Sequence, residues 1–250
     1  NSSVDVFKWL NVGTKMSYTY RDTDENLASI GGTSIWDSAI YLSPLIAADA
    51  VKNPLSTSGA KITMPTYSIS EKTKNTIRSM FNIVGYAQAK LHKRLQFRTQ
   101  VSFFRFDRNK YQYEPSTLPS REDGLGGKAA REYYTENKFT WDNTLTFTKT
   151  FAKRHGFKAM VGSAYYRFTN GAFSLSGQGY MVDDVKWNNM NAVQDKNTYT
   201  AATSSQNKQT LSFFARVNYD YAKRYYLTLT ARADGASNFA ANNKWGFFPS

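Results

Sequence analysis

Hydrophobic and polar residues alternate one by one over several stretches of the chain, most clearly in residues 211–233. Strict alternation with a period of two places one set of side chains on each face of a β-sheet. The apolar set of this stretch has tyrosines near its ends, whereas the polar set contains arginine, aspartate, asparagine and threonine. A short turn at 222–224 divides the stretch into two strands. The pattern predicts an antiparallel sheet with one apolar face and one face that carries charges of both signs.

Alternation elsewhere predicts the rest of an all-β chain of about eight strands. The expected earlier strands span residues 6–20, 75–90, 95–106, 132–151 and 157–169, and residues 211–250 supply three more. Long polar connections at 21–74, 107–131 and 170–207 alternate with short turns at 91–94, 152–156 and 222–224. Bacterial outer-membrane barrels have long loops on the extracellular side and short turns on the periplasmic side. The sequence therefore predicts an antiparallel transmembrane β-barrel segment with long extracellular loops.

Composition narrows the possible functions. Aromatic residues make up 16% of the chain, which suits strands that are apolar at alternate positions. Cysteine is absent, which excludes disulfides, thiolate zinc sites and cysteine nucleophiles. No run of about 18 apolar residues is present, so a transmembrane helix is not expected. The net charge of +13 raises the hypothesis of nucleic-acid binding.

The basic residues, however, are dispersed and partly gathered in the short turns, as at 92–94, 153–155 and 223–224. Two interpretations of these turns stay open. They either contact anionic lipid headgroups or simply keep the hairpins soluble.

Candidate chemistry is sparse. Both histidines lie beside basic turns with no carboxylate near them in sequence. The acidic stretch from Asp22 has Leu27 and Thr33 where an EF-hand requires Gly and Glu, although a calcium site of another type in that loop stays open. The glycine-rich residues 124–129 lack the spacing of a phosphate-binding loop. We therefore expect no catalytic residue, no metal site, no cofactor and no enzyme activity.

A signature near the end of the chain suggests a family. Residues 232–239 read RADGASNF and residues 243–250 read NKWGFFPS. Together they resemble the RxDGSSxFG…NxWGxFPS signature of SusC/RagA-type TonB-dependent transporters of Bacteroidetes. Ala236 stands where the first serine is usual and Ala240 where glycine is common. These departures affect loop detail and leave the resemblance intact.

The resemblance implies more than this chain contains. Transporters of this family have a plug domain, an N-terminal extension and a barrel of about 22 strands. We therefore expect residues 1–250 to form part of the barrel domain, with the plug, the extension and the other strands lying elsewhere. The implied function is import of oligosaccharides or peptides across the outer membrane.

The resemblance also implies partners. They are a SusD-like surface lipoprotein, TonB acting through the plug and N-terminal region, outer-membrane lipids, lipopolysaccharide, and a second transporter–lipoprotein pair in a dimer; nucleic acid is not expected. This segment would supply wall and extracellular loops. Two other interpretations stay open: a passive porin or adhesion barrel, and a soluble basic β-protein that binds nucleic acid through aromatic and arginine side chains.

Alternation also predicts which residues face the barrel interior. The lumen-facing candidates are Arg216, Asn218, Asp220, Thr228, Thr230, Arg232 and Asp234. Aromatic side chains in the long connections either stack on a sugar or pack the loops themselves. The loop candidates for substrate contact are Trp36, Tyr41, Tyr180 and Trp187.

Overall fold

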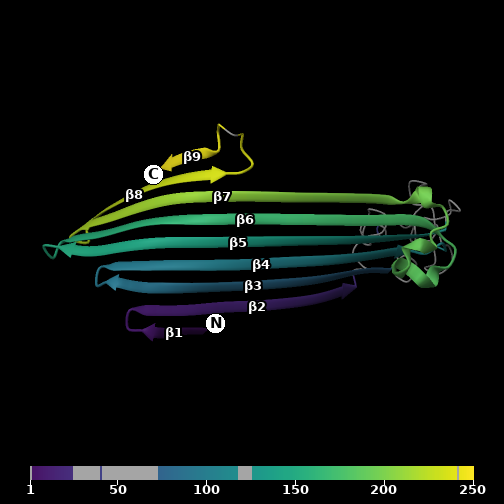
Figure 1. Cartoon of the computed structure of the whole chain (residues 1–250), viewed down its shortest axis with the longest axis horizontal. Helices are drawn as coiled ribbons and strands as arrows, with labels where there is room; N and C mark the ends of the chain where they lie inside the picture. The colour runs from purple at the N-terminus through teal and green to yellow at the C-terminus, as the bar shows by residue number, and fades with distance from the viewer. Residues whose placement is uncertain (1, 25–39, 41–72, 118–125, 241) are drawn as a thin grey trace.

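The computed structural model describes residues 2–24, 40, 73–117, 126–240 and 242–250. These residues form one antiparallel sheet in which every strand pairs with its neighbours in sequence (Figure 1). The nine strands are β1 (Ser2–Phe7), β2 (Leu10–Asp24), β3 (Thr73–His92), β4 (Leu95–Glu114), β5 (Gly127–Phe151), β6 (His155–Tyr180), β7 (Thr200–Tyr221), β8 (Tyr225–Ala236) and β9 (Trp245–Pro249). Three short 3-10 helices lie between β6 and β7: η2 (Asp183–Asn188), η3 (Met190–Ala192) and η4 (Lys196–Thr198). None of the helices in the described part of the chain has the length and apolarity needed to cross a bilayer.

Long and short connections alternate as predicted. The short turns at 8–9, 93–94, 152–154 and 222–224 all lie at one end of the sheet, the short-turn end, on the left of Figure 1. The strand ends that the longer connections join from β2 to β3, from β4 to β5 and from β6 to β7 lie toward the opposite end, the loop end (Figure 1). The turns at 152–154 and 222–224 each begin with two residues of positive φ, and Ala222 has a φ of 55°. Two successive residues of positive φ match the right-handed twist of a hairpin, although alanine tolerates that conformation less well than glycine.

The predicted first strand, residues 6–20, is wrong because the chain forms a hairpin there. β1 ends at Phe7 and β2 begins at Leu10. The turn residues Lys8 and Trp9 include no Gly, Pro, Asn or Asp, so the usual turn signal is missing. The ring of Phe7 stacks on that of Trp9 with centroids 5.6 Å apart. This additional hairpin brings the sheet to nine strands, where about eight were predicted.

Several strands extend further toward the loop end than predicted. β4 continues to Glu114 and β6 to Tyr180, and β7 begins at Thr200, so the predicted connection at 170–207 is wrong and spans 181–199 instead. The extension of β7, residues 200–207, is polar on both faces, so the apolar alternation that marks a strand is missing there. The extensions of β4 and β6 begin with polar residues and regain apolar side chains on one side only further on, at Tyr111 and Phe173. The backbone ladder nevertheless continues, because threonine, tyrosine and phenylalanine still favour extended structure.

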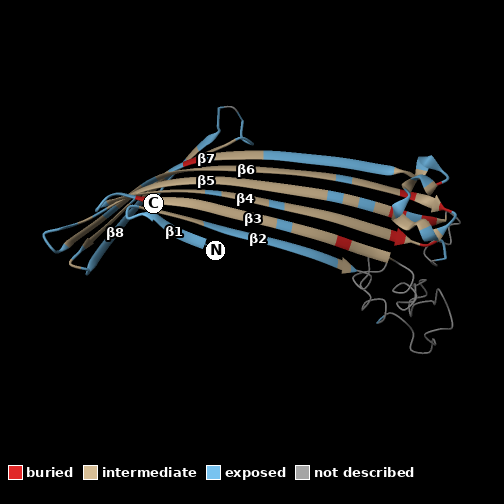
Figure 2. Ribbon diagram, turned by 60° about the horizontal axis from the view of Figure 1, so that its bottom comes forward, coloured by how far each residue is buried: buried red, intermediate tan, exposed pale blue. Residues whose placement is uncertain are grey.

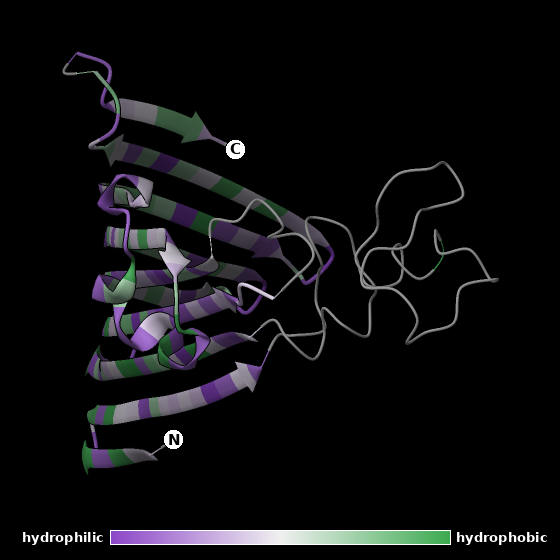
Figure 3. Ribbon diagram, turned by 90° about the vertical axis from the view of Figure 1, so that its right-hand side faces the viewer, coloured by the Kyte–Doolittle hydropathy of each residue, from purple (hydrophilic) through white to green (hydrophobic). Residues whose placement is uncertain are grey.

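The strand registers confirm that the predicted apolar residues share one face. Val217 of β7 lies opposite Leu229 of β8 and Ala159 of β6. We call this side the apolar face and the opposite side the polar face. Figure 3 shows hydrophobic and hydrophilic positions alternating along the strands. Shifting the pairing of a strand by one residue would turn its apolar side chains to the opposite face of the sheet. The observed pairing therefore determines which residues share a face.

Apolar side chains cover the apolar face along only part of the length of each long strand. On β6 it runs from Phe157 to Tyr165 and then meets Arg167, and on β4 it runs from Leu95 to Phe103 and then meets Arg105. About 9–11 residues of a tilted strand suffice to cross a bilayer. The apolar stretch thus has the length of a membrane crossing, and the rest of each long strand rises beyond it toward the loop end.

Over most of its length, the sheet formed by the described residues is a single bowed layer with no second layer packed on it (Figure 2). Large apolar side chains lie open on the apolar face, including Val161 at 53% exposure and Leu229 at 54%. Among the described residues, the buried apolar side chains are Ala89, Tyr113, Ala129, Tyr180 and Val193. An uncovered apolar face of this extent requires an apolar environment.

Candidate functional site: the polar face and the loop end

The seven predicted lumen-facing residues lie together on the polar face of β7 and β8. Asn218 and Thr228 are directly opposite each other, and the Thr228 hydroxyl donates to Asn218 Oδ1 at 3.0 Å. Arg232 forms an ion pair with Asp234 at 2.8 Å and donates to Ser212 Oγ at 3.0 Å. Arg216, Asp220 and Thr230 complete the same face. Its charges are thus partly paired along the wall.

The polar face continues across β3 to β6 with residues that were not among the predicted lumen-facing set. Lys138 of β5 forms an ion pair with Glu136 at 2.6 Å. Its ammonium group lies 5.1 Å from the ring centre of Phe104 and 5.9 Å from that of Phe168. Cations gain stabilisation over aromatic rings. Alternation could have found Lys138, since it lies on the even-numbered side of β5 with Thr140 and Asp142.

A second cation–aromatic contact lies nearer the short-turn end of this face. The guanidinium of Arg98 is 4.4 Å from the ring centre of Tyr86 and donates to Gln100 Oε1 at 2.9 Å. The ring of Tyr86 in turn covers Gly13, where a Cβ atom would lie 2.5 Å from the ring. Glycine at this position therefore lets the ring lie flat on the neighbouring strand, as aromatic residues often do over glycine in sheets.

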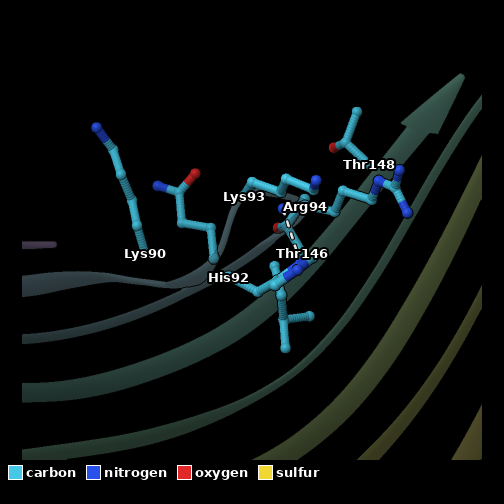
Figure 4. Close-up of a pocket in the computed structure, with 8 residues that line it drawn as sticks. Lys90, His92, Lys93, Arg94, Thr146 and Thr148 are labelled. Carbon is cyan, nitrogen blue, oxygen red and sulfur yellow. Dashed lines mark hydrogen bonds between the residues drawn. The ribbon is translucent and has the colours of Figure 1, made fainter.

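A hollow of about 300 Å³ marks the short-turn end of the polar face. Its lining residues come from β3, β4, β5 and the turn between β3 and β4, and Figure 4 shows several of them. The lining residues are Lys90, His92, Lys93, Arg94, Leu95, Gln96, Thr146 and Thr148. Within the turn, the Arg94 backbone N–H donates to His92 Nδ1 at 3.3 Å.

At the loop end, residues 181–199 fold back onto the strands, and we call them the loop cap. Asp183 anchors the cap to β4, because its carboxylate accepts hydrogen bonds from the Tyr113 hydroxyl at 2.6 Å and the Ser116 hydroxyl at 2.9 Å. The rings of Tyr113 and Tyr180 meet edge to face with centroids 5.6 Å apart. Burial raises the pKa of Tyr113, and the hydrogen bond to Asp183 raises it further. The cap thus has a small apolar core and one hydrogen-bonded polar anchor, Asp183.

The four predicted substrate-contact residues are not brought together. Trp36 and Tyr41 lie outside the described residues. Tyr180 is the last residue of β6 rather than a loop residue, and it is only 1% exposed. Trp187 lies in η2 and stacks on Tyr111 with ring centroids 5.7 Å apart. Substrate contact by these residues stays a prediction.

The loop cap lies on the same side of the sheet as the apolar face. Tyr111 and Tyr113 share the odd-numbered side of β4 with Val101 and Phe103, and the register of β4 with β5 is unbroken between them. Trp187, which packs on Tyr111, is therefore on the side opposite the predicted lumen-facing residues. Between the cap and the membrane-length stretch, Arg105 forms an ion pair with Asp107 at 2.7 Å and lowers the pKa of that carboxyl.

Known proteins resemble this chain in sequence. No family model matches the chain. TonB-dependent receptor P3 of Formosa agariphila is 30% identical over 265 residues, which cover 100% of this chain and 25% of that receptor. TonB-dependent receptor SusC of Bacteroides thetaiotaomicron is 35% identical over 99 residues, which cover 38% of this chain and 9% of SusC.

A solved structure shares the fold. The RagAB peptide importer in its open-open state superimposes with a TM-score of 0.81 at 19% identity, covering 98% of this chain and 27% of that chain. The chain therefore spans about a quarter of the length of the relatives that it matches along its whole length. The relatives, the nine-stranded sheet and the signature at its end agree: the chain belongs to the SusC/RagA type of TonB-dependent outer-membrane receptors, as a segment of the barrel.

Proposed function

We propose that the receptor to which this segment belongs imports oligosaccharides or peptides across the outer membrane with energy supplied through TonB. The observation that carries the proposal is the contrast between the two faces of one sheet. The apolar face has the length of a membrane crossing, whereas the polar face combines ion pairs, amides and aromatic rings. A wall of this kind separates lipid from a wet interior.

The polar face suits either substrate class. Ion pairs such as Lys138–Glu136 and amides such as Gln100 can exchange their partners for the hydroxyls of a sugar or the main chain of a peptide. The rings of Tyr86 and Phe104 lie beside these groups and offer apolar contact area. Likeness to RagAB, a peptide importer, supports peptides as one candidate class.

The loops would meet a SusD-like lipoprotein that covers the extracellular opening. The RagAB likeness supports a partner of this type. In the described part of the chain, the loop cap offers exposed apolar residues at its start, with Met181 73% exposed and Val182 59%. Replacing 182–198 by a short Gly/Ser linker in the full receptor should reduce co-purification of the lipoprotein. Unchanged co-purification would contradict this role of the cap.

Import is tested by uptake of labelled oligosaccharides and labelled peptides into cells that lack the receptor and are complemented with the full-length gene. Uptake of one class should return with the receptor and disappear again when TonB is deleted. Uptake that persists without TonB would instead indicate a passive barrel. A receptor found in the aqueous fraction without detergent would favour the soluble nucleic-acid-binding interpretation.

Two variants test whether the polar face contacts the substrate. Lys138→Gln removes a cation from an ion pair on the polar face, and Arg105→Gln removes one from a similar pair on the opposite face at nearly the same height, since Arg105 lies opposite Asn137. Lys138→Gln should lower uptake while Arg105→Gln leaves it unchanged, with equal amounts of folded receptor. Equal effects of the two substitutions would argue against a polar-face contact.

A further inference from the structure

The short-turn end of the sheet is strongly basic. Its four hairpin turns consist of ten residues, of which seven are Lys or Arg and none is Asp or Glu. The seven basic residues are Lys8, Lys93, Arg94, Lys153, Arg154, Lys223 and Arg224, and we call them the basic rim. All seven are exposed. Ion pairs between described residues join Arg105, Arg108, Lys138 and Arg232 to carboxylates, and none of these four pairs uses a rim residue.

Aromatic side chains lie directly next to these turns. Trp9 stacks with Phe7 in the first hairpin, and Tyr221 stacks with Tyr225 across the last one with ring centroids 6.5 Å apart. The ring of Phe151 lies 4.1 Å from the Lys149 ammonium group. Aromatic girdles of this type lie at the level of lipid headgroups in membrane proteins. The basic rim therefore lies at or just beyond the headgroup level of one leaflet.

The leaflet follows from the connections. Short turns face the periplasm in bacterial outer-membrane barrels, so the rim lies at the periplasmic leaflet. The turns span the width of the described sheet (Figure 1), which presents a row of cations rather than a single site. Lys93 and Arg94 line the hollow at the short-turn end, and the Arg94 side chain lies beside Thr148 (Figure 4). A row of exposed cations at a headgroup level complements a negatively charged surface.

We propose that the basic rim binds the headgroups of anionic phospholipids in the periplasmic leaflet and so enriches these lipids around the receptor. The proposal depends on the placement of the segment in the outer membrane but not on import activity. Each basic side chain near an anionic surface contributes a preference of about fivefold. Several rim residues acting together would hold the short-turn end of the wall at a fixed depth.

The test uses the full-length receptor in lipid nanodiscs that contain phosphatidylethanolamine with a minor share of phosphatidylglycerol. Native mass spectrometry of the receptor released from the discs gives the ratio of phosphatidylglycerol to phosphatidylethanolamine that stays bound. The test variant carries Lys93→Gln, Arg94→Gln, Lys153→Gln and Arg154→Gln. The control variant removes the same number of cations away from the rim, with Lys110→Gln, Lys128→Gln, Arg167→Gln and Lys208→Gln.

The ratio should fall by at least about fivefold in the test variant and stay near the wild-type value in the control. An unchanged ratio, or an equal fall in both variants, would overturn the proposal. The wild-type receptor provides a second measurement that does not depend on the folding of a variant. Its bound phosphatidylglycerol should decrease as salt shortens the screening length from about 10 Å at 0.1 M to about 3 Å at 1 M. Binding that is insensitive to salt would contradict an electrostatic rim.

Discussion

Val161 offers a direct measure of where the bilayer lies. It is on the apolar face of β6, six residues from His155 toward the short-turn end and six from Arg167 toward the loop end. At about 3.4 Å per residue and a tilt of about 45°, each polar boundary is about 14 Å away in depth. Since the apolar band of a transmembrane barrel is about 25 Å tall, Val161 lies close to its midplane.

An arginine at this depth should be costly. Val161→Arg should lower the free energy of unfolding by about 2–4 kcal/mol relative to Val161→Ala. Phe157 and Tyr165 are each four residues away, or about 10 Å nearer a headgroup region. There, arginine should cost only about 0–1 kcal/mol more than alanine. Alanine is the reference at each position because Phe157 and Tyr165 also pack against Phe147 and Phe139.

The assay is denaturant unfolding of the full-length receptor in lipid vesicles, followed by the mobility shift of heat-sensitive barrels on gels. Ala164→Arg provides the control on the polar face. Ala164 lies opposite Asp142, so the new guanidinium would have a carboxylate beside it and should cost less than about 1 kcal/mol. Equal penalties at 157, 161 and 165, or a larger penalty at 164 than at 161, would refute the membrane placement.

Three further outcomes follow from the loop cap and the turns. Tyr113→Phe removes the closest hydrogen-bond donor to Asp183 and should lower the free energy of opening the cap by about 1–3 kcal/mol. Amide hydrogen exchange across 181–199 should become faster, and unchanged exchange would contradict the role of Asp183 as an anchor. Because the pKa of Tyr113 is raised in the folded cap, the cap should be most stable below about pH 10 and lose stability as pH rises further. Tyr113→Phe should weaken this dependence, and burial of Tyr180, whose pKa is also raised, should preserve the rest. Ala222→Gly should raise the free energy of unfolding by about 1 kcal/mol, because it relieves a left-handed backbone, and a decrease would count against that conformation.

The faces of the sheet were predictable from the sequence. Strands such as 211–221 alternate strictly, and one buried or lipid-facing side fixes the register, so alternation alone assigns Val217 and Leu229 to the same face. The alternation of long and short connections likewise predicted that the short turns gather at one end of the sheet. Both signals are local and periodic.

Other features could not be predicted from local patterns. The hairpin at Lys8 and Trp9 has no turn-forming residue, so apolar alternation appeared to run through it. Beyond Phe103 and Tyr165, charged and polar residues interrupt the apolar side of the strands, so the contrast between the two sides is weaker there. The loop cap depends on Asp183 meeting Tyr113, a contact between residues 70 positions apart. A single sequence gives no sign of such a pair.

Contact of one face of the sheet with lipid and of the other with water can be measured residue by residue. The segment contains no cysteine, so single cysteines at 159–164 can be introduced in the full receptor and labelled with a nitroxide without competition from this segment. Paramagnetic relaxation in vesicles then compares oxygen, which concentrates in lipid, with a water-soluble nickel complex. Oxygen should dominate at Ala159 and Val161, and nickel at Met160 and Ala164. The reverse order, or accessibility that does not alternate along β6, would contradict the account.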